Sequence, residues 1–444
     1  MKNFVIDSIL LSNYRKFENY TFHLNPGMNV FIGKNASGKT SVLEAASVML
    51  GAYLAAFKEY VPSRFVQNIS DADVRRKNNK MSKQLAAPQG VPQFPCLIKC
   101  VMKWDEKELS FQRILEKEGS RTKFSEKNPM QKIVNSWESL IKEADGSDEN
   151  LELPLVLYLS SARLWNENRV EEMSKIPNRT DAYQRCLDRK RSSQTGFDYI
   201  RLLANLAVEE NGGKPLDAYE IIMSALKESL AEELREGEQI IYSSRIGEIG
   251  IRQKDGTVIE FSALSDGYRN VIKIVTDIAT RMCILNPYLG ADVLRLTPGV
   301  VIIDELDLSL HPTWQRRIVR ILKTIFPQVQ FICATHSPFI IQSLEEGELI
   351  ALDNDIDDPY SGESIEDIAE NIMDVPTAKY SEKKESIFYA AEEYFQALDG
   401  DVTQERMDEL KERLDILSAE YSDNPAYNAY MKLKYLEKKA GTEE

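Results

Sequence analysis

The sequence has few of the residues that metal-bound and disulfide-bonded proteins depend on. It contains 3 histidines and 5 cysteines in 444 residues, and the cysteines show no CxxC spacing of a zinc site. Cys96 and Cys100 lie in a strand-like segment, where packing is the simplest explanation. The chain also lacks the roughly 20 uncharged apolar residues of a membrane span, and its N-terminus lacks the apolar segment of a secretion signal. These absences predict a reduced, cytoplasmic protein without a membrane partner.

Positively charged residues are also outnumbered by negatively charged ones. Lys and Arg total 55 against 70 Asp and Glu, which gives a net charge of -15. A protein this acidic is not a general nucleic-acid coat, although a local basic patch can still contact DNA. Two basic runs, Arg75–Lys77 and Arg189–Arg191, are candidate patches, and a solvated surface is the plainer interpretation of both.

The hydrophobic pattern predicts an α/β fold with inserted segments. Two strands expected to be fully buried, at 300–303 and 330–334, flank an amphipathic helix at 312–326, and this order implies parallel strands. The predicted segments are an N-terminal head portion (1–57), an inserted β-rich lobe (58–150), a returning core strand (151–165), a helical lobe (166–240), a second head portion (241–380) and an acidic helical tail (381–444).

The sharpest motif is GKNASGKT, which matches G-x-x-x-x-G-K-[ST], follows a predicted strand and opens a predicted helix. Its glycines let backbone N–H groups converge on phosphate oxygens, and the helix N-terminus adds a favourable dipole. Lys39 is placed to reach the β- and γ-phosphates, and the Thr40 hydroxyl to ligate Mg²⁺. The predicted nucleotide-binding residues here are Gly33, Lys34, Asn35, Ala36, Ser37, Gly38, Lys39, Thr40 and Ser41.

A second motif, VVIIDE, is an apolar strand that ends in two acids. Asp304 is placed to hold the Mg²⁺ shell. Glu305 is placed to polarise the attacking water as a general base. A strand-end turn is the alternative for this motif alone, but the phosphate-binding loop favours the catalytic interpretation. Glu305 and Lys39 are therefore predicted catalytic residues.

Two weaker motifs accompany these. His336 follows the next buried strand, in CATHSP, where it could reach the γ-phosphate as a third catalytic residue; a structural histidine is the alternative. Ser265 and Gly267, in FSALSDGYRN, open a predicted helix whose N-terminus could cradle phosphate. A plain N-cap is the commoner role for such a serine.

The order of these motifs resembles the ABC-type ATPases of the SMC, RecF and OLD class. In that comparison LSDGY at 264–268 looks like the signature, Asp304 and Glu305 like the Walker B pair, SLHP at 309–312 like the D-loop, and His336 like the switch histidine. The signature departs from the family's LSGGQ at Asp266 and Tyr268. The resemblance implies an ATP-hydrolysing ABC-type P-loop head and a head-to-tail dimer, or a higher oligomer, with ATP between the heads.

The same resemblance implies two further site residues. It implies a basic residue beside the nucleotide, for which we take Arg15 in NYRKF, with a plain strand turn as the alternative. It also implies a Q-loop ligand of the metal, for which Gln67 is the candidate.

The C-terminal run is similar, more narrowly, to the PtuA-like ATPases of Septu anti-phage systems, which pair with a small HNH nuclease. This similarity implies a defence ATPase that controls a partner nuclease. We expect that nuclease to dock on the tail, because the tail is acidic and carries several aromatic residues, with packing against the ATPase body as the alternative. These residues are Phe388, Tyr389, Tyr394, Phe395, Tyr421, Tyr427, Tyr430 and Tyr435. His311 and His336 fall in ATPase motifs, so we expect no HNH site in this chain. The alternatives are a RecF-like repair or recombination ATPase that acts on DNA directly, and a binding module with little nucleotide turnover.

Overall fold

The structure, a computed structural model, describes most of the chain up to residue 418. The described residues are 3–57, 59–77, 90–124, 128–131, 133–135, 151–164, 173, 175–189, 195–209, 214, 216–243, 247–353, 360–375, 382–398 and 403–418. They belong to two compact units, Met1–Glu363 and Ser364–Glu444. The second unit therefore begins before residue 381, where the sequence predicted the tail to start.

The centre of the first unit is a parallel sheet of five strands in the order β15-β3-β14-β13-β9. The strands are β3 (Met28–Ile32), β9 (Leu155–Leu159), β13 (Gly299–Ile303), β14 (Val329–Ala334) and β15 (Leu349–Ala351). Every residue of β3, β9, β13 and β14 is buried, as expected for a parallel sheet covered on both faces. The predicted parallel pair, β13 with β14, is confirmed.

A second, antiparallel sheet has the order β2-β1-β6-β7-β8. Its strands are β1 (Phe4–Tyr14), β2 (Phe17–His23), β6 (Cys96–Trp104), β7 (Lys107–Leu115) and β8 (Lys123–Phe124); a short pair, β4 (Arg76–Lys77) with β5 (Val91–Pro92), lies between β2 and β6 in the chain. Because β6 pairs along β1, the strands of segment 58–150 complete the N-terminal sheet rather than forming a separate lobe. Cys96 and Cys100 are buried on β6, which confirms their packing role.

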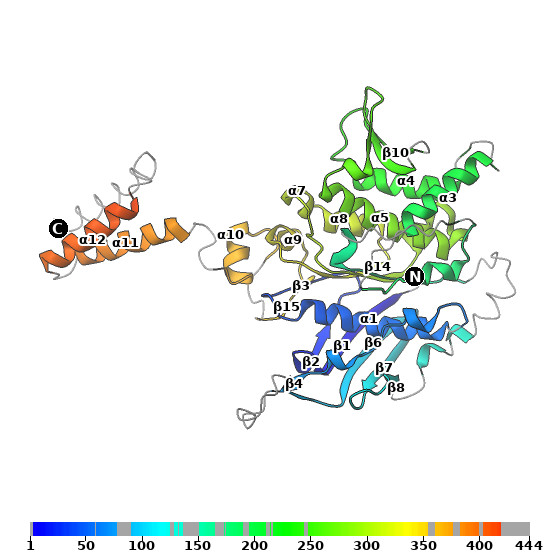
Figure 1. Cartoon of the computed structure of the whole chain (residues 1–444), viewed down its shortest axis with the longest axis horizontal. Coiled ribbons are helices and arrows are strands. Elements are labelled where there is room, and N and C mark those ends of the chain that lie inside the picture. The colour runs from blue at the N-terminus through cyan, green and yellow to red at the C-terminus, as the bar shows by residue number, and fades with distance from the viewer. Residues whose placement is uncertain are drawn as a thin grey trace. The chain divides into compact units, whose positions relative to one another are not determined.

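Helix α1 (Lys39–Ala56) lies between the two sheets (Figure 1) and contacts strands of both. Nearly all of its residues are buried, and only Thr40 is exposed. A helix that is apolar around its whole circumference is expected only where both sides are covered. This burial fixes the start of α1, and therefore the phosphate-binding loop before it, against the carboxyl ends of the parallel strands.

A helical layer lies above strand β14 in the view of Figure 1. It contains α3 (Thr195–Glu209), α4 (Asp217–Ser229), α5 (Asp266–Leu285) and α6 (Val293–Leu296), with the strands β10 (Gln239–Ser243), β11 (Glu248–Arg252) and β12 (Val258–Glu260). Helix α5 contacts β9, while α3 and α4 contact α5. Strands β11 and β12 form an antiparallel hairpin whose turn contains Lys254, Asp255 and Gly256.

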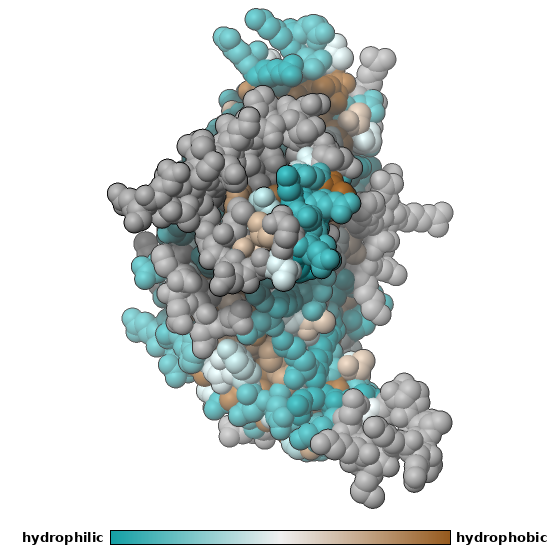
Figure 2. Space-filling model, turned by 90° about the vertical axis from the view of Figure 1, so that its left-hand side faces the viewer, coloured by the Kyte–Doolittle hydropathy of each residue, from teal (hydrophilic) through white to brown (hydrophobic). Residues whose placement is uncertain are grey.

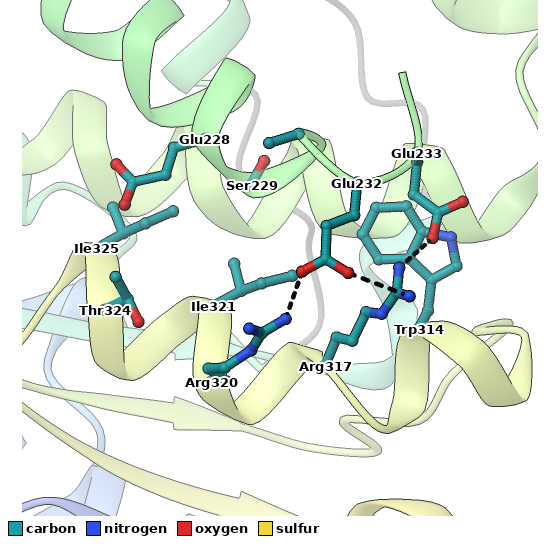
Figure 3. A pocket seen from close by; sticks show the side chains of 11 residues that line it. Glu228, Ser229, Glu232, Glu233, Trp314, Arg317, Arg320, Ile321, Thr324 and Ile325 are labelled. Atoms are coloured by element: carbon teal, nitrogen blue, oxygen red, sulfur yellow. Dashed lines mark hydrogen bonds and ion pairs between the residues drawn. The ribbon is translucent and has the colours of Figure 1, made fainter. Parts of the chain in front are cut away.

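The helix predicted at 312–326 is broken into α7 (Pro312–Gln315) and α8 (Ile318–Ile325), and α9 (Pro338–Gln342) follows β14. Ion pairs join α8 to the turn after α4. Arg317 contacts Glu232 and Glu233, and Arg320 contacts Glu232. These side chains border a pocket of about 150 Å³ (Figure 3), which no residue of the phosphate-binding loop lines.

The second unit contains α10 (Ile365–Asp367), a turn of π-helix (Ile368–Ile372), α11 (Glu382–Leu398) and α12 (Gln404–Ser418). Ile387, Ala390, Ala391 and Leu414 form a small core between α11 and α12, with Tyr394, Phe395 and Leu417 packed against it. The described residues on the face in Figure 2 are mainly hydrophilic. None of the described helices combines the length and apolar character required to cross a membrane.

Candidate active site

The loop from Gly33 to Thr40 connects β3 to α1 in a conformation that needs glycine. Gly38 is the N-cap of α1 in the left-handed region, with φ of 100°. A Cβ atom at Gly33 would lie 2.6 Å from Ser37 Oγ and 2.7 Å from Asp353 Oδ2. Both predicted glycines are therefore required by the backbone conformation of this loop.

Lys39 is the first residue of α1 and is only 8% exposed. Its Nζ donates hydrogen bonds to the carbonyl oxygens of Gly33, at 2.6 Å, and Lys34, at 3.2 Å. Burial lowers the pKa of Lys39, and the carboxylates of Asp353 and Asp304 oppose this shift. The ammonium group thus lies over the loop, where a triphosphate would supply the counter-charge that backbone carbonyls cannot.

The end of β13 brings Asp304 to the start of α1. Thr40 Oγ1 lies 3.4 Å from Asp304 Oδ1. The hydroxyls of Ser37 and Ser160 are buried nearby without a hydrogen-bond partner among the described residues. Ser160 directly follows β9 and lies beside Asp304, because the Asp304 amide donates a hydrogen bond to Leu159 O. These hard oxygen donors fit Mg²⁺, which prefers carboxylate, hydroxyl and phosphate oxygens.

Glu305 and His336 reach the same edge of the sheet. Glu305 follows β13 and is exposed, with φ of 52°. His336 follows β14; partial burial lowers its pKa, and the charge of Lys39 lowers it further. Asp307, which the sequence analysis did not identify, accepts hydrogen bonds from Thr335 Oγ1 at 2.6 Å and from the His336 amide at 3.2 Å. Its signal was a third acid within the segment DELD.

Ser265 and Gly267 lie at the start of α5. Ser265 is the N-cap by position, but its exposed side chain makes no cap hydrogen bond to the helix. This leaves the hydroxyl available, contrary to the plain N-cap alternative. Gly267 is buried, and a Cβ atom there would lie 3.2 Å from Ser309 O. The start of α5 therefore packs closely on the predicted D-loop.

Arg15 is not the residue that lies over the phosphate-binding loop. Its guanidinium pairs with Asp73 at 2.8 Å and with Glu44, and it reaches only Ser41 Oγ, at 3.4 Å. Its neighbour Lys16 takes that position. A Cβ atom at Gly38 would lie 2.9 Å from Lys16 Cε.

Lys16 also forms part of a charged contact that the motifs do not include. Its Nζ lies 3.8 Å from Asp353 Oδ1, and Asp353 Oδ2 accepts a hydrogen bond from the Lys34 amide at 2.7 Å. The loop is thus contacted near its last glycine by Lys16 and near its first by Asp353. These two residues come from the turn after β1 and from the end of β15.

Gln67 is not brought to the metal site. Its backbone lies against Gly51, with Gln67 O 2.8 Å from the position of a Cβ atom there. Gly51 follows Thr40 by three turns of α1, so about 16 Å of helix separates them at 1.5 Å per residue. The Gln67 carbonyl instead accepts a hydrogen bond from Arg113 Nη1 at 2.6 Å, which indicates a structural position.

Residues 4–341 match the family model of the AAA ATPase domain. The chain belongs to this family. Its parallel sheet, with the phosphate-binding loop after β3, the Asp304-Glu305 pair after β13 and His336 after β14, is the fold of an ABC-type P-loop ATPase head. The family also establishes nucleotide binding, which agrees with the loop geometry.

Similarity to three individual proteins shows more specifically which ATPases this chain is related to. The retron Vc95 probable ATPase of Vibrio cholerae is 25% identical over 402 residues, which cover 79% of this chain and 73% of that protein. The Septu protein PtuA of Bacillus mycoides is 41% identical over 98 residues, 22% of this chain and 13% of PtuA. The DNA replication and repair protein RecF of Clostridium botulinum is 55% identical over 40 residues, 9% of this chain and 11% of RecF. The chain is thus an ATPase related to retron and Septu ATPases.

The environment of Asp304 predicts how magnesium binding depends on pH. Burial, with Glu305 adding to it, raises the pKa of Asp304 to about 6. The carboxylate is therefore charged at pH 7.5, and below pH 6 the metal must displace a proton. We expect the Mg²⁺ concentration for half-maximal ATPase activity to rise by about tenfold per pH unit below 6. Asp304→Asn should remove this pH dependence of the Mg²⁺ requirement and leave only the part that comes from the titration of ATP itself. A midpoint near pH 4 would contradict the assignment.

Substitutions at this site should separate nucleotide binding from ATP hydrolysis. Lys39→Ala should abolish binding of a fluorescent ATP analogue, because it removes the buried cation from the loop. Glu305→Gln should keep binding and lose turnover, because the amide cannot accept the proton of water. Glu346→Gln, which removes an exposed carboxylate outside the site, is the matched control. Hydrolysis by Glu305→Gln at the wild-type rate would show that Glu305 is not the base.

Proposed function

We propose that this chain is the ATP-hydrolysing subunit of an anti-phage defence complex and that it controls a separate HNH nuclease. The observation that supports this function best is the breadth of the similarity to a retron ATPase, which extends over 79% of the chain. The similarity to PtuA adds a relative whose class pairs with such a nuclease. The phosphate-binding loop together with the Asp304-Glu305 pair favours turnover over a purely structural nucleotide.

In the proposed reaction each residue has one role. Lys39 binds the β- and γ-phosphates, while Thr40 and Asp304 hold Mg²⁺, which neutralises charge on the transferring phosphoryl group. Glu305 accepts a proton from the attacking water. His336 is neutral at physiological pH because its pKa is lowered, so it can donate one hydrogen bond to the γ-phosphate without adding a charge.

We further propose that two heads associate head-to-tail, with ATP between the P-loop of one and Ser265 of the other. The exposed Ser265 hydroxyl and the N-terminus of the 20-residue helix α5 are the features that support this arrangement. A helix N-terminus carries partial positive charge, which stabilises the charge that develops on the γ-phosphate.

Mixed dimers test the shared site. Lys39→Ala and Ser265→Arg should each inactivate the homodimer, since each occurs in both sites. A mixed dimer keeps one intact site, so random pairing should restore up to about a quarter of wild-type ATPase activity. Full activity of Ser265→Arg alone would contradict the head-to-tail arrangement, and so would the absence of any recovery on mixing the two folded variants.

The second unit is the proposed docking site for the nuclease. Helices α11 and α12 carry nine acidic and five basic residues, which favours a basic partner through electrostatic steering. Two of the aromatic residues predicted for this contact, Tyr394 and Phe395, instead pack in the hairpin core. Tyr389 is 58% exposed and Ile416 is 67% exposed, so these side chains are available. The predicted contacts at Tyr421, Tyr427, Tyr430 and Tyr435 fall outside the described residues, as does the side chain of Phe388.

Co-purification tests this docking site. The proposal requires an HNH protein encoded beside this gene. That protein should co-purify with the full chain and be lost from a chain that ends at Glu363, while both forms still bind ATP. Tyr389→Asp with Ile416→Asp should reduce recovery in the full chain, and Val208→Asp, an equally exposed apolar position in the first unit, should not. Equal recovery with the shortened chain would move the interface to the ATPase unit. No recovery with either would favour the RecF-like alternative.

The alternative, direct action on DNA, is supported by the local identity to RecF. However, two arginines of the candidate basic patches form ion pairs within the protein, which reduces the positive charge available to DNA. Arg189 pairs with Glu44, and Arg75 pairs with Glu18 at 2.9 Å. Of the two basic runs, Arg76 and Lys77 remain exposed on β4, and Lys190 and Arg191 lie outside the described residues.

A further inference from the structure

Arg163 is a buried cation directly behind the two catalytic acids. It follows β9, is 2% exposed, and donates from Nη1 to Asp304 O at 2.6 Å and from Nη2 to Glu305 O at 2.6 Å. A third bond from Nη1 reaches Ser160 O at 3.1 Å. Burial lowers the pKa of Arg163 to about 10, so the guanidinium stays charged at neutral pH. One side chain therefore fixes the backbone of both acids.

The Nε donor of Arg163 reaches α5, the helix that Ser265 precedes. Arg163 Nε donates to Asn270 Oδ1 at 2.7 Å, and Asn270 is fully buried in α5. Asn270 Nδ2 in turn donates to Leu308 O at 2.7 Å, in the loop after Glu305. The Asn270 side chain thus connects the guanidinium to Leu308, directly before the predicted D-loop. Its oxygen accepts one hydrogen bond and its nitrogen donates the other.

Two neighbours on the same face of α5 strengthen this connection. Gly267 packs on Ser309 O, and Lys273 Nζ donates to Arg163 O at 3.1 Å. Gly267, Asn270 and Lys273 are spaced three residues apart, so they lie on one side of the helix. The start of α5, the guanidinium and the loop 305–309 are therefore held together as one body.

The loop also depends on this support for its shape. Glu305 and Ser309 adopt φ of 52° and 56°, a region that residues other than glycine populate sparsely and keep only when their surroundings enforce it. A shift of α5 along its axis would pull on Asn270 and Arg163, and through them on the Glu305 backbone.

We propose that Arg163 and Asn270 are positioning residues that couple the two ATP sites of the dimer. This inference rests on the proposed head-to-tail arrangement. Ser265, at the start of α5, contacts the ATP held by the partner's P-loop, whereas Glu305 of the same chain acts on the chain's own ATP. ATP in one site thereby sets the position of the general base in the other, and linkage requires the effect on binding to be reciprocal.

The test separates cooperativity from binding. In the wild type we expect ATP hydrolysis with a Hill coefficient between 1 and 2, the limit for two sites. Asn270→Ala and Arg163→Lys should bring that coefficient to 1 and lower kcat by about tenfold or more, because the base is no longer aligned. The affinity of a monomeric head for an ATP analogue should change by less than threefold, because Lys39 and its loop are untouched.

Arg281→Lys is the matched control. Arg281 is also a fully buried arginine of α5, paired with Asp277 at 2.9 Å and bonded to Ala182 O, away from the acids. Its loss should lower the melting temperature at least as much as Arg163→Lys and leave the Hill coefficient unchanged. A merely structural role for Arg163 predicts the same result for both arginine variants, and that result would overturn the coupling.

The outcome also separates this inference from the proposed dimer. In a Glu305→Gln background with saturating ATP, light scattering should give a dimer with or without Asn270→Ala, since Ser265 is retained. If the folded Asn270→Ala variant with Glu305 intact still hydrolyses ATP cooperatively, and the dimer forms, the coupling is overturned and the sandwich stays intact. A monomer in the Glu305→Gln background itself overturns the sandwich, and the coupling with it.

Discussion

The ATPase unit depends on keeping two adjacent carboxylates at the end of a buried strand. Asp304 is 7% exposed, and its pKa of about 6 means that holding it ionised at neutral pH costs about 3 kcal/mol relative to a solvated aspartate. This cost would be larger without Arg163, whose charge lowers the pKa of Asp304, and without the hydrogen bond from the Thr40 hydroxyl. A divalent cation would lower this cost, so the site is built to be completed by its ligands rather than to be stable alone.

The position of the phosphate-binding loop follows from burial rather than from the loop itself. Helix α1 is enclosed between two sheets, so its first turn cannot shift relative to β13 and β14 without disturbing both. This arrangement brings Lys39 and Thr40 to Asp304 and His336, although these residues are some 300 positions apart in the chain. It also explains why segment 58–150 matters, because its strands β6 and β7 complete the sheet on the far side of α1.

The sequence predicted those parts of the site that depend on local geometry. Gly33, Gly38 and Lys39 follow from a short motif whose conformation is set within eight residues, and Asp304 and Glu305 follow from the end of an apolar strand. Lys16 rather than Arg15 lies over the phosphate-binding loop because adjacent residues in the tight turn between β1 and β2 point to different sides, which a motif does not specify. Gln67, Arg163 and the pairing of β1 with β6 are set by contacts between distant segments, for which the residue pattern carries no signal.

The charge of the protein also constrains how two heads can meet. Each chain carries a net charge of -15, and ATP adds negative charge, so association without a specific contact is opposed by repulsion. Screening confines this repulsion to about 8 Å at physiological salt, which is comparable to the depth of an interface. The attraction must therefore be local, and the N-terminus of α5 with its free Ser265 hydroxyl supplies positive potential where a γ-phosphate would face it. Because that contact exists only when the nucleotide is bound, the same electrostatics that keep empty heads apart would make ATP occupancy the condition for closing them.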